Sequence, residues 1–172
     1  MRWLFLDRIT EMVPGERAQG LKGVASSEDY FVDHFPSFPV VPGVVQVEAL
    51  AQLSGKLIEI SIYESERRWV WPILSMVRKA KFRRFVRPGD QMVMTTDIVE
   101  LREESAICKV KSTVDGQITT NAELLFVFNP DRLETDEAQK RLEGLERANL
   151  KVLWSEYEAW VERLAADDAA QG

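Results

Sequence analysis

The sequence predicts an α+β domain, and three observations carry that prediction. Residues 44–61 are apolar on nearly every helical face, which is typical of a buried helix. The segments after this helix are strand-like, and Pro88-Gly89-Asp90 and Asp115-Gly116 indicate turns between them. One buried helix followed by an antiparallel meander is an α+β pattern, in which a sheet wrapped around the helix would bury both.

Strands are predicted on both sides of this helix. Before it, residues 3–6 form a first strand or the start of a helix, Pro14-Gly15 forms a turn, and residues 21–25 form a strand. After the helix we expect a surface turn at residues 64–68. The strands that follow are expected at residues 69–76, 78–86, 91–101, 105–114 and 117–128.

A stiff loop is predicted immediately before the helix. Residues 34–43 read His-Phe-Pro-Ser-Phe-Pro-Val-Val-Pro-Gly, with three prolines spaced by three. Because proline has a fixed φ and no amide hydrogen, this segment can be neither a regular helix nor a central strand. Such a loop can hold a side chain and a backbone amide in fixed positions.

The last part of the chain is predicted to be helical. We divide the sequence into a body at residues 1–130 and a C-terminal amphipathic helical extension of the same domain at residues 131–172. Apolar residues recur at helical spacing over residues 133–164, and Gly144 or Asn149 is expected to separate two helices. Three aromatic side chains of the extension are expected to be exposed and to pack over a neighbouring subunit: Trp154, Tyr157 and Trp160.

Charge and hydropathy narrow the classes of function. The formal net charge is −6; from Asp131 onward 11 acids and 6 bases give −5, which leaves −1 for the rest. An acidic protein does not resemble a nucleic-acid binder. No stretch approaches the length of a transmembrane helix, and residues 1–6 are too short for a signal peptide. We therefore expect a cytoplasmic protein without membrane insertion.

One cysteine and one histidine limit the chemistry available. Cys108 cannot form an intrachain disulfide, and its strand-like surroundings predict a small buried core residue rather than a nucleophile. With a single histidine as well, a zinc or other transition-metal site is not expected. His34 is therefore the first candidate for acid–base chemistry near neutral pH.

Two adjacent segments carry a family resemblance. Residues 34–43 match the pattern H-F-P-G-x-P-x-x-P-G, and Glu48-Ala49-Leu50-Ala51-Gln52 matches a helix motif E-A-x-A-Q. Together they resemble the 3-hydroxyacyl-acyl-carrier-protein dehydratases of bacterial fatty acid synthesis, of the FabZ type. Residues 5–9 and 81–91 extend the similarity over about residues 1–129.

Three features depart from the family pattern. Ser37 replaces the usual glycine, Phe85 stands where proline is common, and the tail after Pro130 extends beyond compact members. Neither substitution removes a catalytic group. The tail bears on substrate choice or assembly rather than on the reaction class.

The resemblance implies a hot-dog fold, in which a curved antiparallel sheet wraps a long central helix, and a reaction that needs no cofactor or metal. Members remove water from 3-hydroxyacyl thioesters to give trans-2-enoyl thioesters. By this resemblance His34 takes the C2 proton, Glu48 protonates the departing hydroxyl, and the Gly43 amide at the helix start binds the thioester oxygen. Gln52 and Pro42 are expected to support them.

The resemblance also implies partners. Members form obligate dimers, in which each active site takes its histidine from one subunit and its carboxylate from the other, and dimers often assemble into a hexamer. The substrate arrives on an acidic acyl carrier protein. A local basic run is either a docking site for this carrier or a solvated strand face. Its docking candidates are Lys81, Arg83, Arg84 and Arg87.

Two other functions are open to a chain of this kind. A hot-dog acyl thioesterase would share the fold and the carrier, but hydrolysis needs an activated water rather than a base at C2. The intact pattern of His34 and Glu48 argues against it. A non-catalytic acyl-carrier-binding or assembly subunit would account for the long tail, but it would need neither of these two residues.

Overall fold

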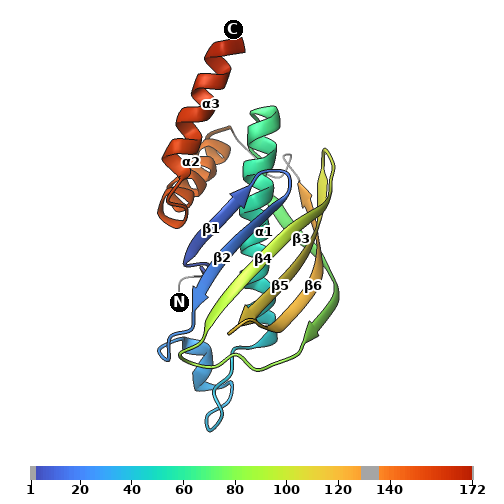
Figure 1. The fold of residues 1–172 in the computed structure, drawn as a ribbon, viewed down its shortest axis with the longest axis vertical. Coiled ribbons are helices and arrows are strands. Elements are labelled where there is room, and N and C mark those ends of the chain that lie inside the picture. Colours follow the sequence, from blue (N-terminus) through green and yellow to red (C-terminus); the bar gives the residue numbers. More distant parts are fainter. Residues whose placement is uncertain (1–2, 129–135, 172) are drawn as a thin grey trace.

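A computed structural model describes residues 3–128 and 136–171. In chain order its elements are β1 (Arg8–Val13), β2 (Arg17–Gly23), the short 3-10 helix η1 (Asp29–Val32), α1 (Gly43–Glu66), β3 (Pro72–Phe82), β4 (Gln91–Leu101), β5 (Ser105–Val114), β6 (Gln117–Phe128), α2 (Asp136–Leu153) and α3 (Tyr157–Gln171). The strands form one antiparallel sheet in the order β1-β2-β4-β5-β6-β3. Figure 1 shows this sheet curling around α1, as the α+β prediction requires. None of the described helices combines the length and the apolar run that crossing a bilayer requires.

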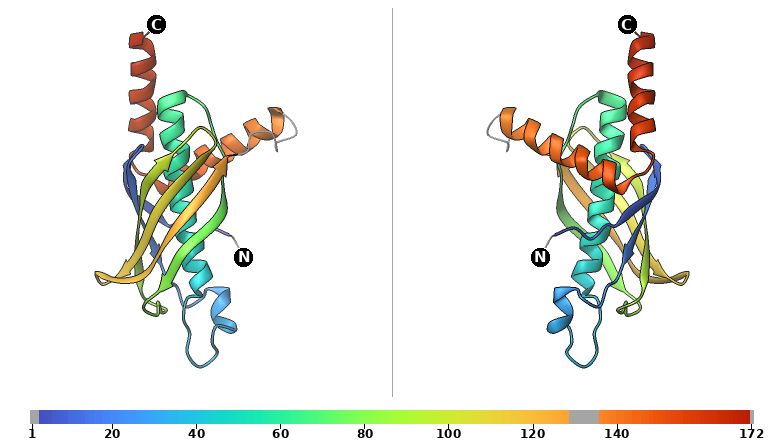
Figure 2. Two further views of the ribbon diagram at one scale, coloured as in Figure 1. Left: turned by 90° about the vertical axis from the view of Figure 1, so that its right-hand side faces the viewer. Right: turned by 90° about the vertical axis from the view of Figure 1, so that its left-hand side faces the viewer.

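The central helix α1 is the most buried element of the fold. Leu50, Leu53, Leu57 and Ile58 have no exposed surface. The helix begins where predicted but continues to Glu66, so the predicted surface turn at residues 64–68 is wrong for its first half. The longer helix follows from its surroundings, because α3 lies beside its last turns (Figure 2) and bonds Glu64 of α1 and the C-cap residue Arg67.

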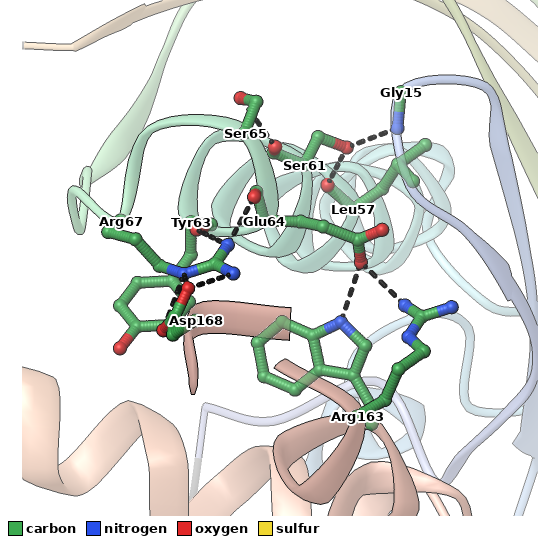
Figure 3. Close-up of polar contacts among 10 residues, drawn as sticks. Gly15, Leu57, Ser61, Tyr63, Glu64, Ser65, Arg67, Arg163 and Asp168 are labelled. Carbon is green, nitrogen blue, oxygen red and sulfur yellow. Dashed lines mark hydrogen bonds and ion pairs between the residues drawn. The ribbon is translucent and has the colours of Figure 1, made fainter. Parts of the chain in front are cut away.

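Each of three polar side chains on α1 bonds a different part of the chain. Gln46 accepts a hydrogen bond of 2.6 Å from a threonine of β6, and the Ser54 hydroxyl lies 2.8 Å from a threonine hydroxyl of β4. Ser61 accepts the amide of Gly15, in the β1–β2 turn, at 2.7 Å (Figure 3). These bonds satisfy polar atoms inside an apolar core and set how α1 lies on the sheet.

The last three strands were predicted with their observed bounds. The hairpin between β5 and β6 is confirmed as well, since Asp115 has φ 50° and Gly116 has φ 74°. Two successive residues with positive φ are the signature of a type I′ turn, whose twist matches that of the flanking strands. Cys108 on β5 is fully buried as predicted, and burial raises the pKa of its thiol to about 11.

The prediction of two strands at residues 69–76 and 78–86 is wrong. The structure has one strand here, β3, which pairs with β6 through two register shifts. Lys79 lies within the second shift with φ 51°. A bulge of this kind breaks the alternation of side chains without ending the strand, so the sequence pattern resembled a strand boundary.

The N-terminal strands are also displaced from their predicted positions. Residues 3–6 form neither strand nor helix, and β1 begins at Arg8. The amide of Phe5 is bonded to the side chain of Gln52 on α1 at 2.8 Å instead of to another strand. The second strand, β2, ends at Gly23 and begins at Arg17, four residues before its predicted start.

The extension forms two helices whose junction differs from the prediction. The chain turns between Leu153 and Tyr157, so a break at Gly144 or Asn149 is wrong, and both residues lie inside α2. The body's predicted end at residue 130 and the helix start at residue 133 lie outside the described residues. In Figure 2, α2 crosses α1 on the side away from β3 and β6, while α3 runs beside the C-terminal half of α1.

The aromatic side chains of the extension are buried within their own chain. Trp154, Tyr157 and Trp160 are only 5 %, 6 % and 4 % exposed, so the prediction that they are exposed is wrong. Packing of the extension over a neighbouring subunit stays a prediction, without these side chains as its reason. The indole of Trp160 donates to Glu64 of α1 at 2.7 Å, and Arg163 donates to the same carboxylate at 2.9 Å (Figure 3). The extension therefore completes the hydrophobic core on a side of α1 that the sheet leaves open.

Truncating a buried leucine of the extension should destabilise the whole fold. Leu150 of α2 is fully buried in the same core cluster as α1, so Leu150→Ala should lower the free energy of unfolding by about 2–5 kcal/mol in denaturant titrations. Val152, on the same helix, is 83 % exposed, and Val152→Ala should change it by less than about 0.5 kcal/mol. Equal losses in the two variants would contradict this account of the extension.

Candidate active site

The loop that carries His34 is held by hydrogen bonds within its own backbone. The His34 amide donates to the carbonyl of Tyr30, and the His34 carbonyl accepts the amide of Val40, both at 3.0 Å. Phe35 and Phe38 exchange two backbone hydrogen bonds of 3.2 and 3.0 Å. The half-buried imidazole stacks on the ring of Phe35 at a centroid distance of 4.3 Å. In Figure 1 this loop projects beyond the N-terminal end of α1.

Gly43 is the first residue of α1 and follows Pro42 at the N-cap. The Pro42 carbonyl accepts the amides of Val45 and Gln46, which leaves the first amides of the helix without an intrahelical partner. A Cβ atom at Gly43 would lie 2.7 Å from the ring of Phe82. Close packing against this ring is a reason for glycine here that is independent of the predicted thioester contact.

Glu48 and Gln52 form a hydrogen-bonded pair one turn apart on α1. The Gln52 amide group donates to Oε1 of Glu48 at 2.9 Å, and the Trp3 indole donates to the same oxygen at 3.1 Å. Within residues 3–128 and 136–171, Oε2 of Glu48 accepts no hydrogen bond. Sequence analysis missed Trp3, and its only signal was an amphipathic indole near the chain start.

A pocket of about 380 Å³ lies against this face of α1. Its floor is a stripe of α1 that runs from Glu48 to Glu59 and includes the small residues Ala51 and Gly55. The other walls come from the N-terminal segment, β3, β6 and α2. The residues of these walls are Trp3, Leu4, Leu6, Pro72, Leu74, Phe126, Glu146, Asn149 and Leu153.

His34 is not among the residues that line this pocket. One chain therefore brings together Glu48 and Gln52, and separately places the His34 loop next to Pro42 and Gly43 at the helix start. It does not bring the imidazole and the carboxyl into one pocket. The predicted catalytic roles stay predictions at this point.

The four docking candidates for the acyl carrier protein do not all lie in one groove. Arg83, Arg84 and Arg87 line a groove of about 520 Å³ whose other walls include Asp90 and Asp115. The last docking candidate, Lys81, lies in β3 and is not part of this lining. Three guanidinium groups against two carboxylates leave the groove with a net positive charge.

The two substitutions that depart from the family pattern, Phe85 and Ser37, lie beside the basic groove and in the His34 loop. The ring of Phe85 meets that of Phe38 edge-on at 5.4 Å, and the guanidinium of Arg87 lies 4.6 Å from the centre of the Phe38 ring. Phe85 therefore links the basic groove to the His34 loop. Ser37 is exposed at the tip of that loop.

A second polar cluster lies farther along the same pocket. Lys56 bonds Glu59 at 3.1 Å and also pairs with Glu146 of α2. Burial raises the pKa of Glu59 to about 7, and Glu146 acts in the same direction while Lys56 opposes both. Burial lowers the pKa of Lys56, but the two carboxylates more than offset this and hold it above its usual value. Among the described residues, no three His, Cys, Asp or Glu side chains form a group that could hold a metal ion.

Comparison with solved structures defines the fold class. The dehydratase heterocomplex ApeI:P from Xenorhabdus doucetiae has a TM-score of 0.62 and 12 % identity, covering 81 % of this chain and 89 % of that chain. A hypothetical thioesterase from Streptococcus pneumoniae TIGR4, solved with coenzyme A, has a TM-score of 0.55 and 14 % identity, covering 71 % and 84 %. At these identities the similarity concerns the fold alone, which is the predicted hot-dog fold.

Comparison of sequences defines the family. The FabA-like domain matches residues 1–123. The 3-hydroxyacyl-acyl-carrier-protein dehydratase FabZ of Clostridium acetobutylicum is 40 % identical over 126 residues, which are 73 % of this chain and 86 % of the relative. The FabZ of Bacillus pumilus is 38 % identical over 128 residues, 74 % of this chain and 87 % of the relative. The chain belongs to the FabA-like family and, within it, to the FabZ-type dehydratases.

Replacing Glu59 by glutamine should remove a pH dependence of stability. A carboxyl whose pKa rises on folding stabilises the native state while it is protonated. This stabilisation is complete below the unfolded pKa of 4.5 and is lost as the pH rises through about 7. The free energy of unfolding of the wild type, minus that of Glu59→Gln, should therefore fall by about 3 kcal/mol over this interval.

Urea unfolding at several pH values measures this difference. The exposed Glu66 at the end of α1 offers a matched control, because Glu66→Gln should keep the wild-type pH dependence. A pH dependence that is the same in all three proteins would contradict the account of Glu59.

Proposed function

We propose that this chain eliminates water from 3-hydroxyacyl thioesters borne on acyl carrier protein and releases trans-2-enoyl thioesters, in fatty acid or related lipid synthesis in the cytoplasm. The observation that carries the proposal is the pocket beside α1. There the half-buried carboxyl of Glu48 has one oxygen bonded and one oxygen free among the described residues, above a floor of small apolar residues. The names of the FabZ relatives describe the same reaction.

The elimination breaks a C2–H bond and the C3–O bond. In the proposed reaction the imidazole of His34 takes the C2 proton, and the electron pair left behind forms the C2=C3 double bond. The C3 hydroxyl leaves with the proton of Glu48 as water. His34 is then protonated and Glu48 ionised, and transfer of one proton from the first to the second through water restores the enzyme.

The negative charge that develops on the thioester oxygen needs a hydrogen-bond donor near C1 to stabilise it. The first amides of α1 have no intrahelical partner, and the positive end of the helix dipole lies there. We assign the Gly43 amide to this oxygen, with Pro42 fixing the direction in which the helix begins. Gln52 supports the reaction by holding Oε1 of Glu48 at 2.9 Å.

The active site is proposed to need two copies of the chain. His34 is absent from the Glu48 pocket within one chain, so the histidine must come from elsewhere. The edge strand β3 carries exposed apolar side chains at Ile73, Met76 and Val77, each more than 40 % exposed. An edge strand of this kind favours pairing with a second copy. A further assembly of three such dimers stays a prediction.

The basic groove is the proposed docking site for acyl carrier protein. Arg83, Arg84 and Arg87 give it a net positive charge, and Phe85 connects it to the loop that carries His34. A carrier with an acidic surface would be attracted to this groove and would deliver its thioester toward the loop. Lys81 at the end of β3 would add to the attraction.

Removing either catalytic group should abolish most of the activity. Hydration of a short enoyl thioester, monitored by the loss of its absorbance, should slow by about 10²- to 10⁴-fold in His34→Ala and in Glu48→Gln. Each of these variants lacks one of the two proton-transfer groups. Retained dimer mass in sedimentation would show that assembly is intact. Wild-type rates in both variants would overturn the catalytic assignment.

Mixing the two inactive variants tests the shared site directly. A heterodimer of His34→Ala and Glu48→Gln should contain one site with both groups intact and should regain activity on co-expression. Each variant carries a different tag for purification of the mixed dimer. A mixed dimer as inactive as its parents would show that both groups act from one chain.

Neutralising the groove should weaken carrier binding without affecting chemistry. Arg83→Ala with Arg84→Ala should raise KM about tenfold for acyl-carrier-protein substrates, and the effect should shrink with added salt. The KM for the same acyl group on free pantetheine should stay constant. As a control, Lys109→Ala with Lys111→Ala removes two charges from β5, away from the groove. Equal effects on both substrates would argue against docking.

A further inference from the structure

We propose that the C-terminal extension excludes long 3-hydroxyacyl chains from the site of this chain. A charged wall closes the end of the Glu48 pocket that is farthest from the Glu48 carboxyl. The extension contributes to this wall. This wall consists of Lys56 and Glu59 of α1 and Glu146 of α2. The inference rests on the proposed function and adds the class of acyl chain that the pocket accepts.

The pocket follows one stripe of α1 away from Glu48. Lys56 is eight residues farther along, which corresponds to about 12 Å along the helix axis. Ala51 and Gly55 lie between them, and a Cβ atom added at Gly55 would meet no atom within 4 Å. An acyl chain that begins at Glu48 therefore passes Gln52 and has open space over Ala51 and Gly55 before it reaches Lys56.

The extension closes this space from the other side. Glu146, Asn149 and Leu153 of α2 line the same pocket, and Glu146 pairs with Lys56 across it. Figure 2 shows α2 crossing α1 on the side that β3 and β6 leave uncovered. The FabA-like match ends at residue 123, so α2 lies beyond the matched region. The wall thus depends on a part of the chain that lies outside the family match.

The charged wall is unfavourable for an apolar chain end. The side chains of Lys56 and Glu59 are 12 % and 5 % exposed, so both charges rely on each other and on Glu146 for compensation. An alkyl chain that reached them would have to separate these partners. Burying one further methylene contributes less than leaving a buried charge unpaired costs. An anionic chain end gains little either, because Lys56 already has two acidic partners.

Replacing the wall with apolar side chains should lengthen the accepted chain. In Lys56→Met with Glu59→Leu and Glu146→Leu, the charges are removed together, which leaves none of them unpaired. The measurement is the ratio of kcat/KM for hydration of sixteen-carbon and four-carbon enoyl-coenzyme A, because a sixteen-carbon chain is longer than the ~12 Å between Glu48 and Lys56. The wild type should favour the four-carbon thioester by at least about tenfold, and the triple variant should raise the ratio by about tenfold.

Filling the path in front of the wall should have the opposite effect. Gly55→Leu places a side chain in the open space above the floor, so the ratio of sixteen-carbon to four-carbon kcat/KM should fall by about tenfold below that of the wild type. This variant tests the inference even if the triple variant does not fold, because no atom of the described residues outside the local helix backbone lies within 4 Å of the added Cβ.

An exposed ion pair on the extension provides the control. Lys151 and Glu158 pair on the surface and do not line the pocket, so Lys151→Leu with Glu158→Leu should leave the ratio at its wild-type value. An unchanged ratio in both pocket variants would overturn the inference. If activity still requires His34 and Glu48, that result leaves the proposed function standing, whereas activity independent of both would overturn the proposed function.

Discussion

The fold depends on the need to bury one helix on nearly all its sides. The apolar surface of α1 cannot be left in water, and a six-stranded sheet with one curved face covers only part of it. The few polar side chains on α1 then decide how its neighbours attach. Ser54 bonds β4, Ser61 bonds the first turn, and Glu64 bonds α3. The hydrophobic effect supplies the stability, and these bonds supply the geometry.

The same helix separates the two proposed catalytic groups. Gly43 lies at its start beside the His34 loop, whereas Glu48 projects into a pocket farther along. Because His34 does not line that pocket, we propose that a second copy of the chain completes a site that uses both groups. Dimerisation would then be part of the chemistry. The exposed edge strand β3 is consistent with this arrangement.

The extension links stability to substrate choice. Its buried aromatic and leucine side chains are part of the same core as α1, and its Glu146 reaches the pocket that contains Glu48. The segment that covers an open side of the core therefore also lines the pocket. Changes to one role are therefore expected to affect the other, because Leu153 of α2 belongs to the core and also lines the pocket beside Glu146 and Asn149.

The fold class, the buried helix, the last three strands and the family could be predicted from the amino-acid sequence. Each rests on local patterns such as the proline-rich loop at residues 34–43, the apolar run of α1 and the hairpin signal at Asp115-Gly116. The other features arise from tertiary contacts. The bulge at Lys79, the burial of Trp160 and the meeting of Lys56 with Glu146 depend on contacts between residues far apart in the chain. Periodicity along a sequence reports which side chains share a face, but not which distant surface that face will meet.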